Sequence, residues 1–142
     1  MVRFLLDAGA DVNQRSMTEQ TPLHQAVFYG HMPIVDLLLE YGADIKAGDV
    51  NGLQVVHYAV DCGRPEMLQH VLSRGADVHA TDSNGWTPLF RAVVQGAATK
   101  IAEVLVEAGA EAAAVDRAGL ALPAAARVLL ARGSYGFNTY TR

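Results

Sequence analysis

The amino-acid sequence predicts an all-α solenoid, in which helix-turn-helix units of constant length stack side by side. Two observations carry this prediction. The tripeptide Gly-Ala-Asp begins at Gly9, Gly42 and Gly75, and Gly109-Ala110-Glu111 continues the series, with spacings of 33, 33 and 34 residues. Between these markers, apolar residues recur with the periodicity of amphipathic helices. A fixed period near 33 residues is typical of arrays whose units bury their apolar faces against one another.

The first helix of each unit is predicted from its end signals. Thr21 and Thr87 are suitable N-caps, because a threonine hydroxyl accepts a hydrogen bond from an N–H at the start of a helix. Pro22 and Pro88 follow at the first helical position, where the missing N–H of proline costs nothing. A left-handed glycine is then expected to end each of these helices, at Gly30, Gly63 and Gly96.

The second helix of each unit has one wide apolar face. Apolar pairs recur at i, i+1, i+4 and i+5, which is the spacing of residues on one side of a helix. They are Ile34, Val35, Leu38 and Leu39, then Met67, Leu68, Val71 and Leu72, then Ile101, Ala102, Leu105 and Val106. The third unit contains one extra residue between Gly96 and Gly109, which we expect near Thr99 and Lys100.

The second unit is expected to be weaker than its neighbours. Gln54 and Val55 replace the Thr-Pro pair that begins the other two units. Loss of an N-cap costs about 1 kcal/mol, and a weak unit of a nearly one-dimensional array opens locally.

A short motif at the start of the first helices points to a known family. Thr21-Pro22-Leu23-His24 recurs two periods later as Thr87-Pro88-Leu89-Phe90, with Gln54-Val55-Val56-His57 as a divergent copy between them. This motif and the period near 33 resemble the ankyrin repeat family, from Val2 to about Gly133. The resemblance implies short β-hairpin finger loops, and partner proteins gripped by the finger tips and the exposed side of the first helices. It therefore predicts a non-catalytic protein–protein interaction module, an adaptor or scaffold.

The predicted ankyrin repeat domain covers residues 1–133. It begins with a partial repeat over 1–16, continues with repeats 17–49, 50–82 and 83–116, and ends in a shortened cap over 117–133. Residues 134–142 lack apolar periodicity and are predicted to form a flexible tail. Because the chain opens inside a second helix, we expect a fragment of a longer array or a misplaced start codon. The open end is expected to fray or to self-associate weakly, since it leaves little cover for Val2, Phe4, Leu5 and Leu6.

Composition and charge argue against several other classes of protein. The 142 residues are 51% hydrophobic with a formal net charge of −4, so the chain can bury a core. The basic residues are scattered, without the basic patch of a nucleic-acid binder. The apolar runs are too short for a membrane span, and the first residues lack the features of a signal peptide. Cys62 is the single cysteine, which fits a reducing compartment and predicts a cytosolic or nuclear location.

No group of residues in the sequence predicts catalysis, a cofactor or a metal. His24 and His57 lie one period apart, which places them about 8–10 Å from each other, too far for a shared metal. We interpret them as residues that tie neighbouring turns together. His70 is expected to be a half-buried structural imidazole, with a pH-sensitive packing role as the alternative, and Cys62 an ordinary surface thiol. One acidic residue per unit forms a ladder rather than a catalytic pair: Asp11, Asp44, Asp77 and Glu111.

Residues that differ between units supply the candidate binding site. They lie at the finger tips, at the ends of the first helices and just before the glycines that close the units. Those expected to contact a partner protein are Met17, Gln20, Phe28, Tyr29, Tyr41, Leu53, Asp61, Arg74, Trp86 and Gln95. Aromatic residues and arginine are enriched in binding hot spots. Leu53 and Trp86 are predicted to be central anchors of a groove, with Asp61 and Arg74 selecting charge.

Several alternatives stay open at this point. Isolated exposed apolar residues need no functional explanation, Trp86 could pack against the neighbouring finger, and Tyr41 could cover the end of its helix. The domain could be an inhibitor that blocks an enzyme or a transcription factor, or the targeting part of a larger enzyme. Residues 5–13 also resemble the ankyrin finger segment that an asparagine hydroxylase modifies, with Asn13 as the acceptor. The simpler interpretation is that Asn13 is a structural residue of the finger.

Overall fold

The computed structural model describes residues 2–110. Within this range the chain forms seven helices and no strand. The helices are α1 (Val2–Asp7), α2 (Pro22–Phe28), α3 (Met32–Glu40), α4 (Val55–Cys62), α5 (Pro65–Ser73), α6 (Pro88–Val94) and α7 (Thr99–Glu107). The predicted cap over 117–133, the tail over 134–142 and the last acidic residue of the ladder, Glu111, lie outside the described residues.

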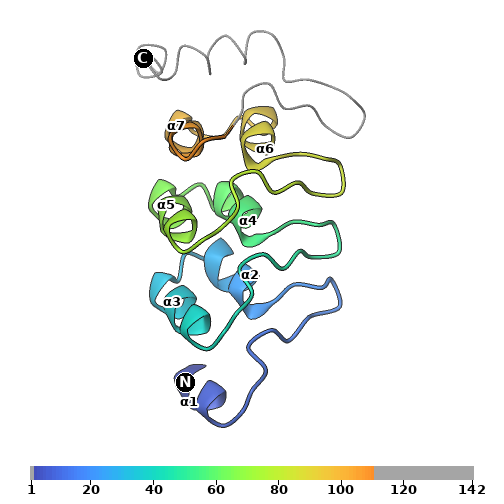
Figure 1. Ribbon diagram of the computed structural model, residues 1–142, viewed down its shortest axis with the longest axis vertical. Coiled ribbons are helices and arrows are strands. Elements are labelled where there is room, and N and C mark those ends of the chain that lie inside the picture. Colours follow the sequence, from blue (N-terminus) through green and yellow to red (C-terminus); the bar gives the residue numbers. More distant parts are fainter. Residues whose placement is uncertain (1, 111–142) are drawn as a thin grey trace.

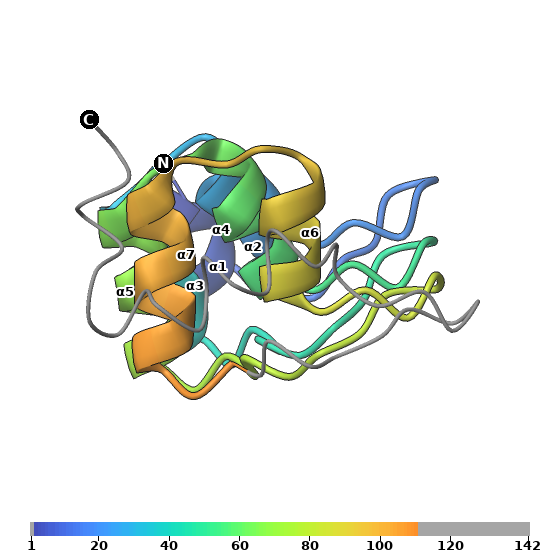
Figure 2. The same ribbon diagram turned by 90° about the horizontal axis from the view of Figure 1, so that it is seen from above.

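The helices stack in two layers (Figure 1). The inner layer contains α2, α4 and α6, which are the first helices of three successive units. The outer layer contains α1, α3, α5 and α7. The loops between units all project to the same side, beyond the inner layer, as the view from above shows (Figure 2). This arrangement confirms the predicted all-α solenoid of helix-turn-helix units.

The helix ends follow the predicted signals. The hydroxyl oxygen of Thr21 accepts a hydrogen bond from the N–H of His24 at 3.4 Å, and that of Thr87 accepts one from the N–H of Phe90 at 3.1 Å. The prolines that follow occupy the start of α2 and α6. The glycines after the first helices are left-handed, with φ of +76° at Gly30, +72° at Gly63 and +69° at Gly96. These glycines turn the chain from the inner layer to the outer one.

The apolar faces of the second helices meet the first helices in one continuous core. Val35, Leu68, Val71, Ile101 and Leu105 are 0% exposed. The last member of each predicted face is only partly buried, because it lies at the rim of the core: Leu39, Leu72 and Val106. Each buried aliphatic side chain contributes about 1.5–3 kcal/mol relative to an exposed one, so this core holds the layers together.

The extra residue of the third unit lies slightly earlier than predicted. α3 and α5 begin two residues after their glycines, whereas α7 begins three residues after Gly96. Helices α3, α5 and α7 each have nine residues. The insertion therefore lengthens the turn at Ala97 and Ala98, and Thr99 and Lys100 already belong to the helix. A turn can absorb the residue, whereas an insertion within the helix would rotate the following apolar positions by about 100° away from the core.

The fingers are tight turns and not paired strands. In the second finger, the N–H of Asp49 donates to the carbonyl of Leu53 at 3.0 Å, and the N–H of Gly52 donates to the carbonyl of Asp49 at 2.9 Å. Oδ1 of Asp49 accepts two further bonds, from the N–H groups of Asn51 and Leu53. Two backbone bonds are too few for a ladder of strands, and no part of residues 2–110 is in a β-strand. The β-hairpins that the resemblance implies are therefore not seen in these fingers.

Glu19 occupies a backbone position that glycine occupies in the other two fingers. Its φ is +64°, against +77° for Gly52 and +78° for Gly85. A residue with a Cβ is strained in this region by roughly 1–2 kcal/mol. We therefore expect Glu19→Gly to raise the free energy of unfolding by about 1 kcal/mol, as measured by urea denaturation. Gly52→Ala is the matched control and is expected to destabilise the chain, because its Cβ would lie 3.1 Å from the N–H nitrogen of Ser83.

Neighbouring units are joined by the two motif histidines. Nε2 of His24 lies 2.9 Å from the carbonyl oxygen of Leu53, and Nε2 of His57 lies 3.2 Å from that of Trp86. Both imidazoles are fully buried. This geometry confirms the interpretation that His24 and His57 tie successive turns together.

Asn13 and the acidic ladder also have structural partners. Oδ1 of Asn13 accepts a bond from the N–H of Asp44 at 2.8 Å, and its Nδ2 lies 3.4 Å from the carbonyl oxygen of Gly42. Asp11, Asp44 and Asp77 each accept a hydrogen bond from the N–H two residues further along the chain. Asn13 is thus a structural residue that connects two units, and its hydroxylation stays a prediction.

The start of α4 lacks a side-chain cap, as its sequence predicts. The side chain of Gln54 makes no capping hydrogen bond and its buried Oε1 has no partner, whereas the N–H of Gln54 donates to Nδ1 of His57 at 3.1 Å. We expect Gln54→Thr to raise the free energy of unfolding by at least about 1 kcal/mol, because it supplies a cap and removes an unpaired acceptor. Thermal and urea denaturation measure the change. Thr87→Gln, at the same position of the next unit, is expected to lower stability by a similar amount. If both substitutions shift stability in the same direction, the capping explanation is wrong.

Two apolar side chains of α1 are poorly covered. Phe4 is 71% exposed and Leu5 is 49% exposed, whereas Leu6 packs against the core. Self-association through this end stays a prediction.

Candidate functional site

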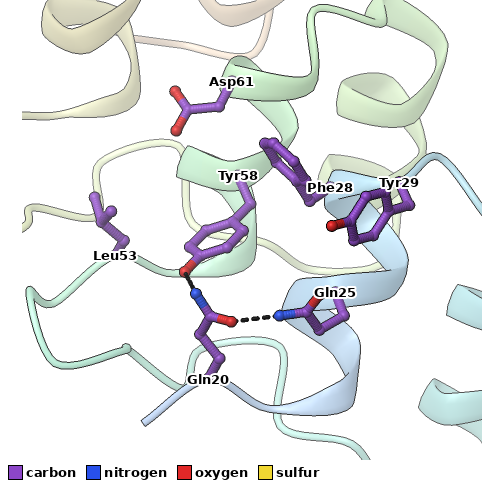
Figure 3. A pocket seen from close by; sticks show the side chains of 7 residues that line it. All are labelled: Gln20, Gln25, Phe28, Tyr29, Leu53, Tyr58 and Asp61. Carbon is purple, nitrogen blue, oxygen red and sulfur yellow. Dashed lines mark hydrogen bonds between the residues drawn. The ribbon is translucent and has the colours of Figure 1, made fainter. Parts of the chain in front are cut away.

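A pocket of about 260 Å³ opens between the inner helices α2 and α4, beside the second finger (Figure 3). It brings together five of the residues that the sequence predicts to contact a partner: Gln20, Phe28, Tyr29, Leu53 and Asp61. Gln25 and Tyr58 complete the lining. The pocket is therefore built from two neighbouring repeats.

The α-helical periodicity of α2 places its aromatic residues on the outside. The helix buries Leu23, Ala26 and Val27 against the core, so the opposite side turns toward solvent. Phe28 and Tyr29 follow at its end and are 44% and 58% exposed. Their rings lie 5.3 Å apart, edge to face. The end of α2 thus presents two uncovered aromatic rings at the mouth of the pocket.

Tyr58 of α4 forms the floor of the pocket. Its hydroxyl donates to Oδ2 of Asp49 at 2.6 Å and accepts from Nε2 of Gln20 at 2.8 Å. Oε1 of Gln20 in turn accepts from Nε2 of Gln25. Burial raises the pKa of Tyr58, and the hydrogen bond to Asp49 raises it further. The phenol therefore stays protonated and holds the second finger against the helices.

Gln25 and Tyr58 were not predicted as site residues, for different reasons. Tyr58 is only 8% exposed and lies in a run of apolar residues, so its position indicates a core residue. Gln25 lies three residues before Phe28, which places both on one face of α2. That spacing is a usable signal for Gln25, which lies about one helical turn before Phe28.

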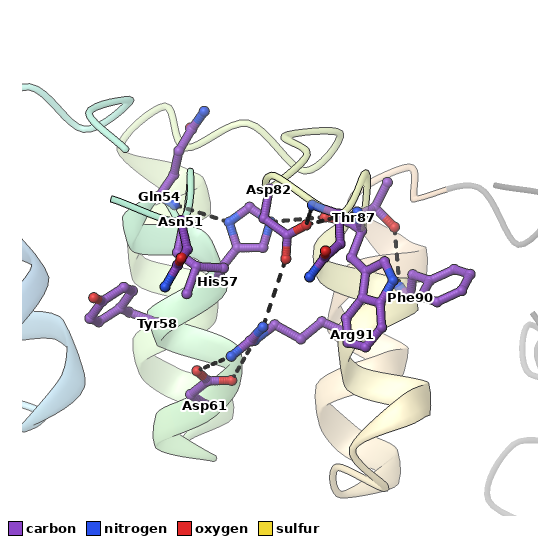
Figure 4. A network of polar contacts seen from close by, with 12 residues as sticks. Asn51, Gln54, His57, Tyr58, Asp61, Asp82, Thr87, Phe90 and Arg91 are labelled. Atoms are coloured by element: carbon purple, nitrogen blue, oxygen red, sulfur yellow. Dashed lines mark hydrogen bonds and ion pairs between the residues drawn. The ribbon is translucent and has the colours of Figure 1, made fainter. Parts of the chain in front are cut away.

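Asp61 is held in an ion pair that joins α4 to α6 (Figure 4). Nε and Nη2 of Arg91 donate to the two carboxylate oxygens of Asp61 at 2.8 and 2.9 Å. Nη1 of Arg91 lies 3.8 Å from Oδ2 of Asp82, whose side chain is 3% exposed. The hydrogen bond to Asp61 raises the pKa of Arg91. Both oxygens of Asp61 accept hydrogen bonds from Arg91, so the charge of Asp61 is paired within the fold. We call this ion pair between Asp61 and Arg91 the clamp between α4 and α6.

Gln95 lies beside this clamp. In the amide orientation that satisfies both neighbours, its nitrogen donates to Asp61 at 3.0 Å and its oxygen accepts from Arg91 at 3.2 Å. Gln95 is exposed and lies outside the pocket lining.

Arg74 and Tyr41 lie in the outer layer, away from the pocket lining. Oδ1 of Asp36 on α3 lies 2.9 Å from Nη1 of Arg74 and 2.6 Å from Nε2 of His70. The hydroxyl of Tyr41 donates to Asp7 and so joins the end of α3 to α1. His70 is partly buried, which confirms the predicted half-buried imidazole. Its pairing with Asp36 was not predicted.

The remaining predicted residues are dispersed. Trp86 is partly buried, and its ring lies 5.4 Å from that of Phe90 in the helix that follows it. Leu53 is also partly buried and faces the pocket. Met17 at the tip of the first finger is 102% exposed. Of the two predicted anchors, only Leu53 lies at the pocket.

Metal-binding clusters and membrane-spanning helices are absent from the described residues. Between residues 2 and 110, no three His, Cys, Asp or Glu side chains are placed to hold a metal ion. No helix in that stretch is long and apolar enough to cross a membrane. Cys62 is partly buried, and burial raises the pKa of its thiol, which donates to the carbonyl of Ala59.

Comparison with known proteins assigns the fold to a family. A family model described as ankyrin repeats in three copies matches residues 1–82 and again residues 49–116. The chain therefore belongs to the ankyrin repeat family, whose members are generally non-catalytic protein–protein interaction modules. No curated protein matches the chain as a close relative.

Proposed function

We propose that this chain is a protein-binding module, an adaptor or scaffold, and that it grips its partner through the surface around the α2–α4 pocket. The observation that carries the proposal is the pair of exposed aromatic rings, Phe28 and Tyr29, beside a pocket that two repeats build together. Aromatic side chains with restricted rotamers are favoured as hot spots of binding.

The surroundings of the pocket support the same proposal. Tyr58 and the core below it are rigidly held, so the surface is formed before a partner arrives. Preorganisation lowers the entropic cost of binding. The exposed tips of the first two fingers, with Met17 and Val50, extend the apolar surface beyond the pocket. A partner segment laid across α2 and α4 would contact all of these features.

The binding face is tested with a double variant, Phe28→Ala and Tyr29→Ala. Both side chains are exposed, so the fold is expected to survive, and circular dichroism checks this. We expect a protein captured from a lysate of the source cells by the wild type to be lost by the variant. Calorimetry with the purified partner should then show an affinity at least about tenfold weaker.

Val94→Ala is the matched control. Val94 occupies the position of Phe28 two repeats later, is 48% exposed and lies outside the pocket lining. It should leave the affinity unchanged. Equal loss in the control, or no loss in the double variant, would show that the partner binds another face. If the captured partner is an enzyme whose activity falls on binding, the chain acts as an inhibitor.

A further inference from the structure

We propose that Ser16 is a phosphorylation site, and that its phosphate takes the place that a carboxylate holds in the next two fingers. The proposal goes beyond the proposed function, since it assigns a chemical modification to the first finger. It follows from a comparison of the three fingers at one equivalent position. The residue there is Ser16 in the first finger, Asp49 in the second and Asp82 in the third, each 33 residues after the last.

The two aspartates hold their fingers closed with one carboxylate oxygen. Oδ1 of Asp49 accepts from the N–H groups two and four residues further on, at 2.8 and 3.0 Å. Oδ1 of Asp82 accepts from the corresponding N–H groups of the third finger, also at 2.8 and 3.0 Å. Hydrogen bonds to an ionised acceptor are shorter and stronger than those to a neutral one. Each of these turns is therefore a pair of backbone N–H groups arranged around an anion.

The second carboxylate oxygen faces the inner helix of the same unit. Oδ2 of Asp49 accepts from the hydroxyl of Tyr58 on α4 at 2.6 Å. Oδ2 of Asp82 lies 3.8 Å from Nη1 of Arg91 on α6 (Figure 4). Tyr58 and Arg91 are equivalent residues one period apart, and Gln25 holds the same place on α2. Both later units thus place a donor of the inner helix opposite the anion, and the amide of Gln25 is such a donor as well.

Ser16 fills the same position without a charge. Its Oγ accepts from the N–H groups of Thr18 and Gln20, two and four residues further on, at 3.3 and 3.2 Å. These bonds are longer than those to the aspartates, because the hydroxyl is neutral and one bond shorter than a carboxylate. Serine has no second side-chain oxygen to offer to Gln25, whose Nε2 donates to Gln20 instead. The first finger therefore keeps the N–H pair of an anion site and lacks the anion.

A phosphate on Ser16 would supply that anion. It carries about −1.5 to −2 charges at pH 7 and three acceptor oxygens, enough for the two N–H groups and for Gln25. The hydroxyl oxygen forms a bond to the γ-phosphorus of a nucleoside triphosphate held by a protein kinase. The bond from this phosphorus to the nucleoside diphosphate breaks, and the hydroxyl proton passes to a base of the kinase.

The first finger is accessible to a kinase. Ser16 and its neighbours Arg15, Met17, Thr18 and Glu19 are all exposed. A kinase binds its target segment in an extended form, so the turn has to open. Strain at Glu19, whose φ is +64°, lowers the free energy needed for that opening.

The charges of the first finger can accommodate a phosphate. Nη1 of Arg15 donates to the carbonyl of Glu19 at 3.0 Å, so a guanidinium lies against the same turn. The carboxylate of Glu19 is the opposing charge, 3.8 Å from Nη1 of Arg15. Its side chain is 54% exposed, so water screens its repulsion. Asp49, the anion of the next finger, is bound by its own two N–H groups and by Tyr58.

The modified finger adjoins the candidate binding surface. Gln20 donates its N–H to Oγ of Ser16, and its side chain lines the α2–α4 pocket. Met17, directly after Ser16, is the exposed tip of the finger. The phosphate would add negative charge next to both, so the modification lies where it can change the affinity for a partner protein.

The first part of the test asks whether Ser16 is modified. The purified full chain is incubated with adenosine triphosphate and a lysate of the source cells, and phosphopeptides are mapped by mass spectrometry. Ser83 is the matched control within the chain, because it is an exposed serine in a finger that already contains Asp82. We expect phosphate on Ser16 and none on Ser83. Absence of phosphate from Ser16, or equal modification of both serines, overturns the proposal.

The second part measures what the phosphate does, with phosphoserine incorporated during translation. Ser16→phosphoserine is expected to raise the equilibrium constant for folding roughly tenfold in urea denaturation, through charge-assisted hydrogen bonds. The amide proton signals of Thr18 and Gln20 should move downfield when the phosphate loses its second proton at about pH 6. Ser83→phosphoserine should give no such gain, because the N–H pair of its finger already binds Asp82.

Two simpler variants check the anion site itself. Ser16→Asp recreates the residue of the other two fingers and should raise stability, whereas Ser16→Ala should lower it. A loss of stability on phosphorylation, or signals of Thr18 and Gln20 that do not respond to the phosphate, would show that the turn receives no anion. The capture experiment with the Phe28 and Tyr29 variant is independent of these results, so their failure leaves the proposed function standing.

Discussion

Replacing Arg91 by methionine is expected to lower the free energy of unfolding by about 3 kcal/mol, since breaking a buried ion pair by removing one partner costs about 3–5 kcal/mol. Methionine keeps most of the volume of arginine but removes its charge. The side chains of Asp82 and Asp61 are only 3% and 22% exposed, so their carboxylates would be left without a cation in a poorly solvated site. We take the lower end of the range because Asp61 retains some contact with water.

Urea denaturation of Arg91→Met measures this loss, and two further variants interpret it. Arg74→Met breaks the ion pair between Arg74 and Asp36 in the outer layer. The two side chains are 38% and 39% exposed, so the free energy of unfolding should fall by less than about 1 kcal/mol. Adding Asp61→Asn to Arg91→Met should recover part of the stability, because one uncompensated charge is removed. If Arg91→Met costs no more than Arg74→Met, the clamp between α4 and α6 contributes little to the fold.

The fold is also expected to lose stability steeply below about pH 6.5, through His24 and His57. The N–H of Thr21 donates to Nδ1 of His24 at 3.0 Å, so this nitrogen carries no proton, and Nε2 donates to the carbonyl of Leu53. His57 repeats the arrangement, with Gln54 as the donor to its Nδ1. A second proton on the imidazole would sit on Nδ1. The new N–H would then face the backbone N–H of Thr21 or Gln54, with no acceptor between the two donors. Burial lowers the pKa of both imidazoles, more than their carbonyl partners raise it.

The sign of the effect follows from proton uptake. Below the ordinary histidine pKa of 6.5, the unfolded chain binds a proton at each site and the folded chain does not, so acid favours unfolding. Each histidine contributes up to about 1.4 kcal/mol per pH unit, until the pH reaches its lowered pKa in the folded chain. Stability from this source is fully present above pH 6.5 and is lost as the pH falls.

Urea denaturation between pH 7.5 and 5.5 measures the slope. His57→Gln removes one titrating group, so the variant should show a smaller dependence on pH than the wild type, whatever its stability at neutral pH. His24→Gln should reduce the slope independently. A slope that is the same in all three proteins would assign the acid sensitivity to other groups.

The repeat pattern predicted the helices and their ends well, because those features depend on local signals. A threonine cap, a proline in the first turn and a left-handed glycine each act within a few residues, as Thr21, Pro22 and Gly30 show. The predicted position of the extra residue in the third unit was less accurate. The number of residues between the glycines shows that one has been inserted, but it does not show whether the turn or the helix contains it.

The pairing of charged side chains was not predicted, because it depends on how one repeat lies against the next. Asp61 and Arg91 are 30 residues apart, which is one period of 33 less roughly one helical turn. Residues with that separation lie opposite each other on neighbouring inner helices. A comparison of equivalent positions alone cannot reveal the pairing of Asp61 with Arg91, and the contact of Asp61 with a partner stays a prediction. Trp86 is partly buried beside Phe90, and its contact with a partner stays a prediction.

Because the pocket is shared by repeats 17–49 and 50–82, it constrains how the gene can grow by duplication. A whole repeat copied after residue 82 would lengthen the array and leave both walls of the pocket in place. A copy of repeat 83–116 inserted between residues 49 and 50 would part Phe28 from Tyr58 by the thickness of one unit, whereas a tandem copy of either repeat of the pair would recreate the junction. The array can therefore gain modules on either side of this junction, and the pocket persists wherever these two repeats remain neighbours.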